Sequence, residues 1–496
     1  MTIKQLALII CITVLCCYST TAQKEEVSLN LTLDQAIEIA FNQSIYSFRQ
    51  KHMYLASYWD FRSYKAEKLP LLGLTSTPVS YNRTITSRYE DGEDVLVPSE
   101  RFSSDATLDV SQNIIATGGK VSVSSEFRRL ENLESGNVSY SSIPFSIGIS
   151  QPIGGYNYFK WQSKIEPLKF EQAKREYLQS LQELSERTTN VFFNLIKAEI
   201  NLNIAETNVF NADTLYRIGK GRFEIGTVTQ DELLDLELSL LNANIALSKS
   251  KVDLEQARYS INSFLGLDDN VNIICVLPSE IPEFKIQVDE AMAMALENNP
   301  DILNYKQQLI EADRGIAQAR GNNGIDASVS ANFGYNKNTD KFDEVYQSPY
   351  GDDQRLSLSL GIPIVDWGKK RGQVQMARSN KRVQEATVRQ SKIDFEQNVF
   401  LQVMEFNMQE EQVKISAKAD TIAQRGYEVT KQRFLIDKVD VIKLNAARNS
   451  VDAAKRSYIE SVQTYWTNYF NIRKTTLYDF ETNVTLMKEL DSLLQK

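Results

Sequence analysis

The sequence predicts a mainly helical protein with added β-strands, built from two copies of one large module. Three observations carry this prediction. The chain repeats itself at long range, each copy contains more than 50 consecutive residues without glycine or proline, and strand-like segments precede each of these stretches. Internal repetition is considered first because overlooking it assigns the wrong architecture.

Two pairs of segments reveal the repetition. The stretch "LTLDQAIEIAFNQSIYS" (31–47) returns as "IQVDEAMAMALENNPDI" (286–302), with Asp34 on Asp289 at an offset of 255. The stretch "RFEIGTVTQDELL" (222–234) returns as "RFLIDKVDVIKLN" (433–445) at an offset of 211. Periods above 200 residues are far too long for a solenoid. We therefore interpret them as a duplication, with the first copy at 23–285 and the second at 286–496.

The first 22 residues have the pattern of a secretory signal peptide. Lys4 precedes an apolar run from Leu6 to Cys17, and small residues lead to Ala22. The run is shorter than the roughly 20 apolar residues that span a bilayer. Cys16 and Cys17 leave a lipoprotein signal as the alternative, although neither follows the small residue that such signals usually carry. Removal of this segment leaves one cysteine, Cys275, so no intramolecular disulfide is expected.

Charge and motifs exclude several classes of function. The net charge of −9 argues against a nucleic-acid partner, which requires basic surface. A single histidine, His52, argues against most histidine-based metal sites and catalytic triads. The chain also lacks the G-x-S-x-G, P-loop and H-E-x-x-H motifs and any paired-cysteine motif. We expect no enzyme activity, no catalytic or metal-binding residues and no cofactor.

Each copy is expected to begin with a helix. Thr32 and Gln35 have the spacing of a capping box that opens the first helix, which is predicted to run toward Leu69. The corresponding helix of the second copy starts near Asp289 and is interrupted by Pro300. The first copy has Ile45 at that position.

The long stretches at 168–218 and 373–425 predict helices of about 75–80 Å at 1.5 Å per residue. Apolar residues recur with alternating steps of four and three, first outward and then on the return, which is the seam of a coiled coil. We therefore predict helical hairpins at 157–266 and 368–475. The seam residues are Tyr177, Leu181, Leu184, Thr188, Val191, Leu195, Ala198, Leu202, Ala205, Val209, Ala212 and Tyr216, then Leu233, Leu236, Leu240, Ala243, Leu247, Ser250, Leu254, Ala257, Ile261 and Phe264.

Strands are expected within 70–153 and 327–364, where apolar and small polar residues alternate. Alternation alone fits a sheet packed on a soluble core equally well. Small neutral residues on the opposite face, and aromatic residues just past the strand ends, favour a β-barrel in lipid. The aromatic residues are Tyr156, Phe159, Trp161 and Trp367. The side chains predicted to face lipid are Phe145, Ile147, Ile149, Leu356, Leu358 and Leu360.

The two offsets differ by 44 residues, and the difference falls in the strand region of the first copy. The segment "DATLDVSQNIIATGGKVSVSSEF" (105–127) contains two strand-like runs around a Gly-Gly turn. The excess therefore predicts either a longer external loop or an added hairpin.

These segments together resemble the TolC-like family of outer-membrane efflux proteins. The resemblance covers nearly the whole mature chain and includes the paired helix starts, "QPIGG" (151–155), "IPIVDWGKKRGQVQMA" (362–377) and the two R-F-x-I tips. It implies a homotrimer in the lipid of a Gram-negative outer membrane, with four strands per chain in a shared twelve-stranded β-barrel. The helices would form a periplasmic α-helical barrel. The duct would be passive, and its partners would be a periplasmic adaptor (membrane fusion) protein and an inner-membrane pump of the RND, ABC or MFS type. It would serve a tripartite efflux pump or type I secretion system.

The resemblance also implies functional residues at the hairpin tips near 219–227 and 426–440. The expected adaptor-contact residues are Gly219, Lys220, Gly221, Gly226, Gly426 and Lys438. Where the family commonly carries an acidic pore residue, this chain has Lys443, and the next such position is Ala446. We hypothesise that Asp440, with Asp437, replaces the acidic ring, and that Glu232 contacts Phe434 of the neighbouring tip in the closed state.

An exported structural coiled-coil protein, similar to an adhesin, is the alternative of another class. It would explain the signal peptide and the heptads. It does not explain strands placed at equivalent positions in both copies.

Overall fold

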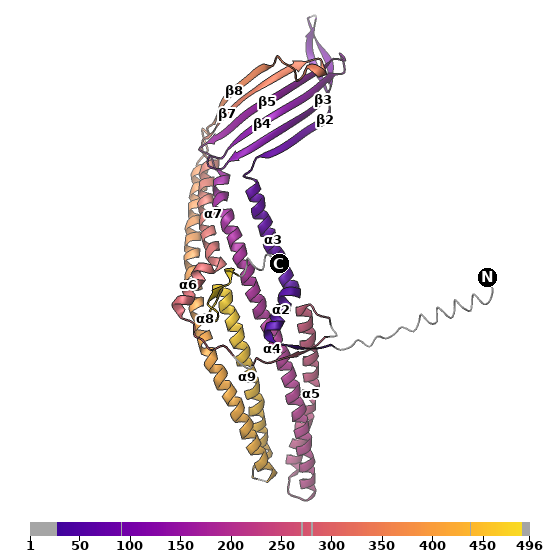
Figure 1. The fold of residues 1–496 in the computed structure, drawn as a ribbon, viewed down its shortest axis with the longest axis vertical. Coiled ribbons are helices and arrows are strands. Elements are labelled where there is room, and N and C mark those ends of the chain that lie inside the picture. Colours follow the sequence, from indigo (N-terminus) through magenta and orange to yellow (C-terminus); the bar gives the residue numbers. More distant parts are fainter. Residues whose placement is uncertain (1–26, 91, 269–270, 279–280, 437, 489–496) are drawn as a thin grey trace, which may run out of the picture. The chain divides into compact units, whose positions relative to one another are not determined.

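The computed structural model describes residues 27–90, 92–268, 271–278, 281–436 and 438–488 (Figure 1). The chain divides into two compact units. Unit 1 contains the chain up to residue 50, residues 178–291 and the chain from residue 400 onward; unit 2 contains residues 51–177 and 292–399. The predicted signal peptide at 1–22 and Asp437 lie outside the described residues.

The predicted capping box opens helix α2 (Leu33–Gln43). The Thr32 backbone N–H donates to Gln35 Oε1 at 3.0 Å, and the Gln35 N–H donates to Thr32 Oγ1 at 3.4 Å. The helix then stops, because Ser44 is extended with ψ 142°. Ser44 Oγ accepts from the Ser47 N–H at 3.1 Å, which caps the next helix, α3 (Ile45–Ala66). The expectation of one helix running toward Leu69 is therefore wrong.

The second copy breaks its first helix at the equivalent residue. Helix α6 (Val288–Asn298) is followed by α7 (Pro300–Asn322), and Asn299 caps α7 by accepting from the Asp301 N–H at 2.8 Å. Ser44 and Asn299 are separated by the same 255 positions as the aligned helix starts. Both residue types are favoured helix caps. The first copy can therefore have Ile45 where the second has Pro300, because both breaks depend on the capping residue and not on the proline.

The long helices exceed their predicted lengths. Helices α4 (Tyr158–Glu224) and α8 (Lys369–Leu435) have 67 residues each, or about 100 Å. Gly219 and Gly221 lie within α4, and Gly426 lies within α8. The helices therefore continue past the ends of the glycine-free stretches at 168–218 and 373–425, from which their lengths were predicted. A glycine costs a helix only about 1 kcal/mol, which packing readily offsets. No helix in the described ranges is both long and apolar enough to cross a membrane.

The chain returns along α5 (Gln230–Leu265) and α9 (Val441–Thr476), which have 36 residues each. Every residue of the predicted seam is buried or half-buried, which agrees with the coiled-coil hairpin. At Gly219 the two helices approach closely, because a Cβ added there would lie 2.3 Å from Leu236 Cδ1. This glycine therefore permits close packing between α4 and α5.

Unit 1 also contains short strands that the sequence patterns did not predict. Strand β1 (Val27–Leu31) pairs in parallel with β6 (Val271–Cys275). Strands β9 (Tyr478–Asp479) and β10 (Val484–Thr485) pair in antiparallel fashion. The parallel pair β1–β6 joins residues about 240 positions apart. Segments of only five residues carry no sequence pattern from which this pairing could be predicted.

Unit 2 contains one antiparallel sheet of six strands in the order β2-β3-β4-β5-β7-β8 (Figure 1). The first copy supplies four strands and the second two, with the short 3-10 helix η1 (Phe342–Glu344) between the last pair. The strands are β2 (Leu71–Glu90), β3 (Glu93–Ile114), β4 (Gly119–Asn132), β5 (Val138–Ile153), β7 (Asp326–Thr339) and β8 (Gly351–Gly361).

The resemblance implied four strands from each chain, whereas the described sheet contains six. The 44-residue excess does not form a loop. Its alternating segments pair within the sheet, with the turn at Gly118 and Gly119 between β3 and β4. A barrel of twelve strands would use four of these six strands from each of three chains.

Candidate functional site

The six-stranded sheet has one continuous apolar face. Residues directly opposite one another in an antiparallel pair share a face. Following the register across the sheet therefore gives rows of side chains, and the central row is apolar over five consecutive strands before it reaches Gln354. This row consists of Leu72, Val110, Val123, Ile147 and Phe333.

The opposite face is polar and small. Side chains alternate between the two faces along a strand. The neighbours of each residue in the apolar row therefore point to the opposite face. The corresponding row contains two glycines, two serines and two carboxylates: Gly73, Asp109, Ser124, Ser146, Gly334 and Asp353. A sheet of this kind can separate an apolar medium from water.

All six side chains predicted to face lipid lie on the apolar face and are exposed in the single chain. The register places Ile149 opposite Ala331 and Ala331 opposite Leu356, which joins β5 to β8. Leu356 is 78% exposed, so nothing in the described chain covers this face at its edge. Contact of these residues with lipid remains a prediction.

One aromatic residue predicted near the membrane boundary is almost fully exposed. Trp367 is 96% exposed and follows the end of β8, in the loop before α8. Its φ of 51° is unusual for a residue with a side chain. This conformation turns the chain from the strand into the long helix.

The first hairpin tip is a tight turn closed by a capping box. Gly226 has φ 76°, a conformation that glycine adopts readily. The Thr229 N–H donates to Glu232 Oε2 at 2.9 Å, and the Glu232 N–H donates back to Thr229 Oγ1 at 3.5 Å. A hydrogen bond from Thr229 lowers the pKa of the neighbouring Asp231 carboxyl. Glu232 therefore stabilises the start of α5.

The second hairpin tip uses an aspartate as its cap. Asp440 Oδ1 accepts from the Lys443 N–H at 2.8 Å at the start of α9. Lys438 and Lys443 are both exposed. Among the tip glycines named from the sequence, only Gly226 lies in a turn. Lys220, on the last turns of α4, is also exposed.

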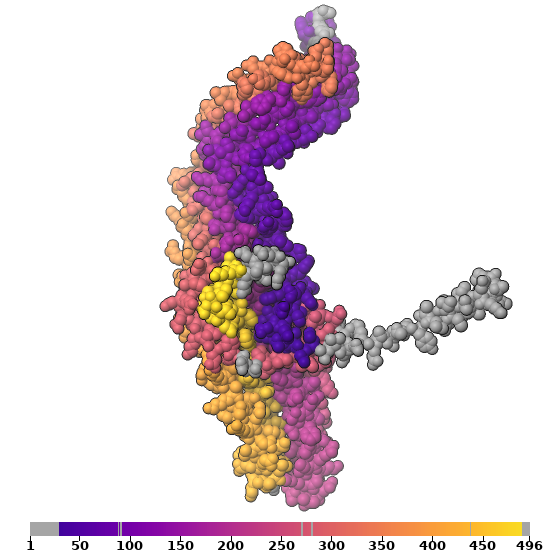
Figure 2. Space-filling model, viewed as in Figure 1, coloured from indigo at the N-terminus to yellow at the C-terminus, as the bar shows by residue number. Residues whose placement is uncertain are grey.

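The two tips lie next to each other in unit 1 (Figure 2) and enclose a groove of about 520 Å³. It brings together three acidic side chains, Glu232, Asp235 and Asp440, with Arg448. Buried atoms Nε and Nη1 of Arg448 have no hydrogen-bond partner among the described residues. The groove therefore collects charged groups from both repeats at one end of the helices.

Phe434 has an environment that its repeat counterpart lacks. It is 6% exposed, whereas Phe223, the equivalent residue at an offset of 211, is 41% exposed. The Arg222 guanidinium lies 5.8 Å from the centroid of the Phe434 ring, within range of a cation–π interaction. A smaller cavity of about 360 Å³ is lined by both Phe434 and Glu232. The sequence singled out Phe434 but missed Arg222, because the R-F pair looks the same in both copies.

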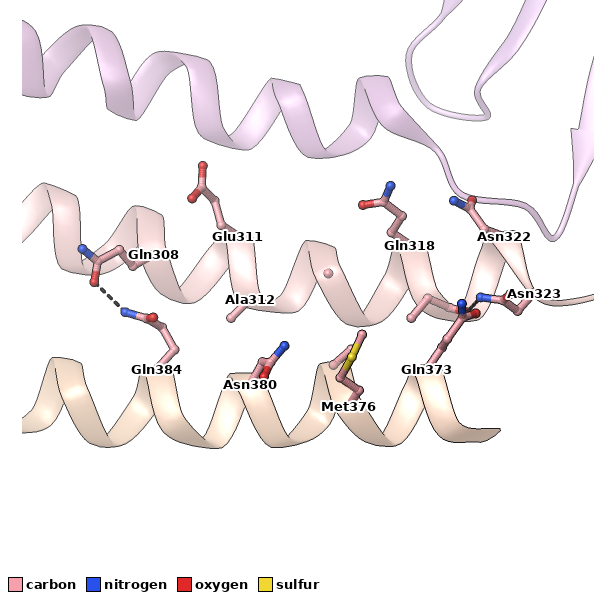
Figure 3. Close-up of a pocket in the computed structure, with 13 residues that line it drawn as sticks. Gln308, Glu311, Ala312, Gln318, Asn322, Asn323, Gln373, Met376, Asn380 and Gln384 are labelled. Atoms are coloured by element: carbon pink, nitrogen blue, oxygen red, sulfur yellow. Dashed lines mark hydrogen bonds between the residues drawn. The ribbon is translucent and has the colours of Figure 1, made fainter. Parts of the chain in front are cut away.

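Unit 2 holds a second groove between α7 and α8, lined mainly by amide side chains (Figure 3). Its volume is about 580 Å³. Gln384 donates to Gln308 Oε1 at 2.7 Å across it, and Asn323 donates to the Ala319 carbonyl at 2.9 Å. Amide side chains offer hydrogen-bond donors and acceptors but carry no net charge. The sequence patterns gave no sign of this groove.

Comparison with known families decides the identity. The family model of the outer membrane efflux protein matches residues 117–267 and 291–476, more than half of the chain and both copies of the module. The chain belongs to the outer membrane efflux protein family.

Solved structures of outer-membrane channels have the same fold. The CmeC outer membrane channel of Campylobacter jejuni is 14% identical, with a TM-score of 0.66 over 93% of this chain and 88% of that chain. VceC of Vibrio cholerae is 12% identical, with a TM-score of 0.61 over 90% of this chain and 96% of that chain. The open-state MtrE channel of Neisseria gonorrhoeae is 15% identical, with a TM-score of 0.57 over 90% and 88%. The comparison with curated protein sequences gave no match.

Membership of the outer membrane efflux protein family confirms the resemblance and the fold class predicted from the sequence. The protein is an efflux channel of the Gram-negative outer membrane with a periplasmic helical portion, and it is not an enzyme. The adhesin-like alternative is thereby excluded.

Proposed function

We propose that the protein is the passive, homotrimeric export duct of a tripartite efflux pump or type I secretion system. The sheet of each chain would form part of the wall in the outer membrane, and the hairpins would line a tunnel through the periplasm. Its partners would be a periplasmic adaptor and an inner-membrane pump of the RND, ABC or MFS type.

The observation that carries this proposal is the two-faced sheet. Its apolar face continues across the register from Leu72 to Phe333, while the opposite face carries Gly73, Ser124 and Asp353. A wall between lipid and a water-filled lumen requires this alternation. The two repeats, at 23–285 and 286–496, would each contribute strands to this wall and one hairpin to the tunnel.

The tips are the proposed adaptor contact. A photo-crosslinking amino acid at Lys220 or Lys438, both exposed near the tips, is expected to form a covalent adduct with a co-expressed adaptor. The matched control is the same amino acid at Asp94, an exposed residue of β3. Adducts at Asp94 but at neither tip residue would place the adaptor at the sheet instead of at the tips. Adducts are identified by mass spectrometry.

Asp440 is the residue proposed to attract cations at the closed end of the duct, together with Asp437. In a trimer each acid occurs three times around one axis, which concentrates negative potential in a narrow passage. Asparagine caps a helix about as well as aspartate, so Asp440→Asn removes the charge and keeps the cap. Block of planar-bilayer conductance by a trivalent cation is then expected to weaken by at least about tenfold. Unchanged block would show that Asp440 acts only as a cap.

Glu232 and Phe434 are proposed to meet between neighbouring tips in the closed state. Within the single chain their recorded partners are Thr229 and Arg222, respectively. If the closed trimer uses the contact, Glu232→Gln, which can still form the capping box, should raise the resting conductance. If Glu232→Gln has the same resting conductance as wild type, Glu232 and Phe434 do not form this contact in the closed state.

A further inference from the structure

The strands added to the first copy can be identified from the two repeat offsets. Strand β2 starts at Leu71 and β7 starts at Asp326, a separation of 255 that matches the helices preceding them. Strands β5 and β8 both lead into the long helices, α4 and α8, where the offset is 211. Strands β3 and β4 are therefore the hairpin without a counterpart in the second copy.

This added hairpin continues both faces of the sheet. Val110 and Val123 lie in register between Leu72 and Ile147 on the apolar face. Asp109 and Ser124 lie in register between Gly73 and Ser146 on the polar face. An external loop has no reason to maintain this alternation, whereas a strand with lipid on one side and water on the other requires it.

The two outer strands, β2 and β8, are the edges of the sheet in the described chain. Leu72 and Leu74 on β2 are 64% and 71% exposed, and Leu358 on β8 is 63% exposed, so the apolar face reaches both edges. In an antiparallel sheet of six strands the first and last run in opposite directions. The β2 edge of one copy can therefore continue the β8 edge of another in the same antiparallel pattern. An unpaired edge facing lipid would leave its backbone N–H and C=O groups without hydrogen-bond partners, since lipid offers none.

We propose that β3 and β4 are membrane-spanning strands, so that each chain contributes six strands and β2 of one copy pairs with β8 of the next. The proposal rests on the trimeric duct proposed above. Three copies then close a wall of eighteen strands. Since barrel diameter grows roughly linearly with strand number, this wall would be about one and a half times as wide as one of twelve strands. Walls of 16–18 strands enclose an aqueous channel.

The position of the added strands is tested with bimane-labelled cysteines in vesicles that contain brominated phospholipid, a quencher confined to the acyl chains. Val123→Cys reports on the added hairpin and Ile147→Cys on β5. Ser124→Cys and Ser146→Cys are the matched controls on the opposite face. The parent is Cys275→Ser, which also measures background labelling. Quenching of equal size at positions 123 and 147, with little at 124 and 146, is expected.

Two other results have different meanings. Quenching at position 147 without quenching at 123 would overturn the inference, because β3 and β4 would lie outside the membrane while the proposed duct stands. Quenching at neither position would remove the membrane wall, and the proposed function with it. The two failures are therefore distinguishable.

The pairing of edges is tested by disulfide scanning between copies. Thr75→Cys on β2 is combined in turn with Arg355→Cys, Ser357→Cys or Ser359→Cys on β8, all on the polar face by register. Opposite edges of one sheet cannot meet within a chain, so any bond joins two copies. At least one pair is expected to give linked dimers and trimers on a non-reducing gel, and each single variant none. An intact trimer in which no pair cross-links would overturn the proposed joint.

Discussion

Leu358→Arg is expected to destabilise the membrane-inserted protein by about 2–4 kcal/mol, provided that the side chain lies near the bilayer midplane. Leu358 lies on β8 opposite Val329, on the apolar face, and it is 63% exposed in the single chain. Arginine there would have to bring its charge into lipid or distort the bilayer around it. The measurement is denaturant unfolding of the protein in vesicles, supported by the heat resistance of the assembled protein on gels.

The matched control is Ser359→Arg, the next residue on the same strand. Ser359 lies opposite Ser328 on the polar face, so its arginine would point into the proposed lumen. This variant should differ from wild type by less than about 1 kcal/mol, as exposed substitutions usually do. Equal stability of the two arginine variants would show that the two faces of the sheet are not exposed to lipid on one side and water on the other.

Phe434→Ala is expected to destabilise the helix ends around it by about 3 kcal/mol, the lower end of the range for truncating a buried phenylalanine. The ring is 6% exposed and the Arg222 guanidinium lies 5.8 Å from its centroid. Its loss would leave a cavity and remove this cation–π contact. Hydrogen exchange of the backbone amides at the ends of α4 and α8 measures the local effect without requiring global unfolding.

The repeat itself supplies the control for this experiment. Phe223 occupies the equivalent position in the first copy, also after an arginine, but it is 41% exposed. Phe223→Ala should therefore cost less than about 1 kcal/mol. Equal acceleration of exchange in both variants would mean that the two tips are packed alike, contrary to the structure.

Local patterns allowed the sequence to predict the elements that depend on neighbouring residues. The Thr32–Gln35 capping box and the heptad seam are signals of this kind, and the structure contains both. The break at Ser44 was missed because it lacks proline and glycine, the usual marks of a break. The ends of α4 and α8 were placed too early because glycine was given more weight than the packing around it.

The features that depend on distant residues could not be predicted in the same way. The 44-residue excess was visible as a length, but only the pairing of β3 with β2 and β4 shows that it widens the sheet. The burial of Phe434 rather than Phe223 depends on which helix covers each ring, and the R-F pair is the same in both copies. The sequence singled out Glu232 and Asp440 near the tips. The groove that joins these two residues and Asp235 to Arg448 depends on how the helices of both repeats pack together.

The added hairpin also shows how such a channel can change its width during evolution. The chain enters the sheet from α3 and leaves it into α4, so an insertion must bring the chain back to the side from which it departed. A single extra strand would end at the opposite end of the sheet, so the helix that follows would begin there. A pair of strands does not, because the second reverses the direction of the first. Sheet width can therefore grow in steps of two strands per chain, and threefold symmetry would turn each such insertion into a step of six strands.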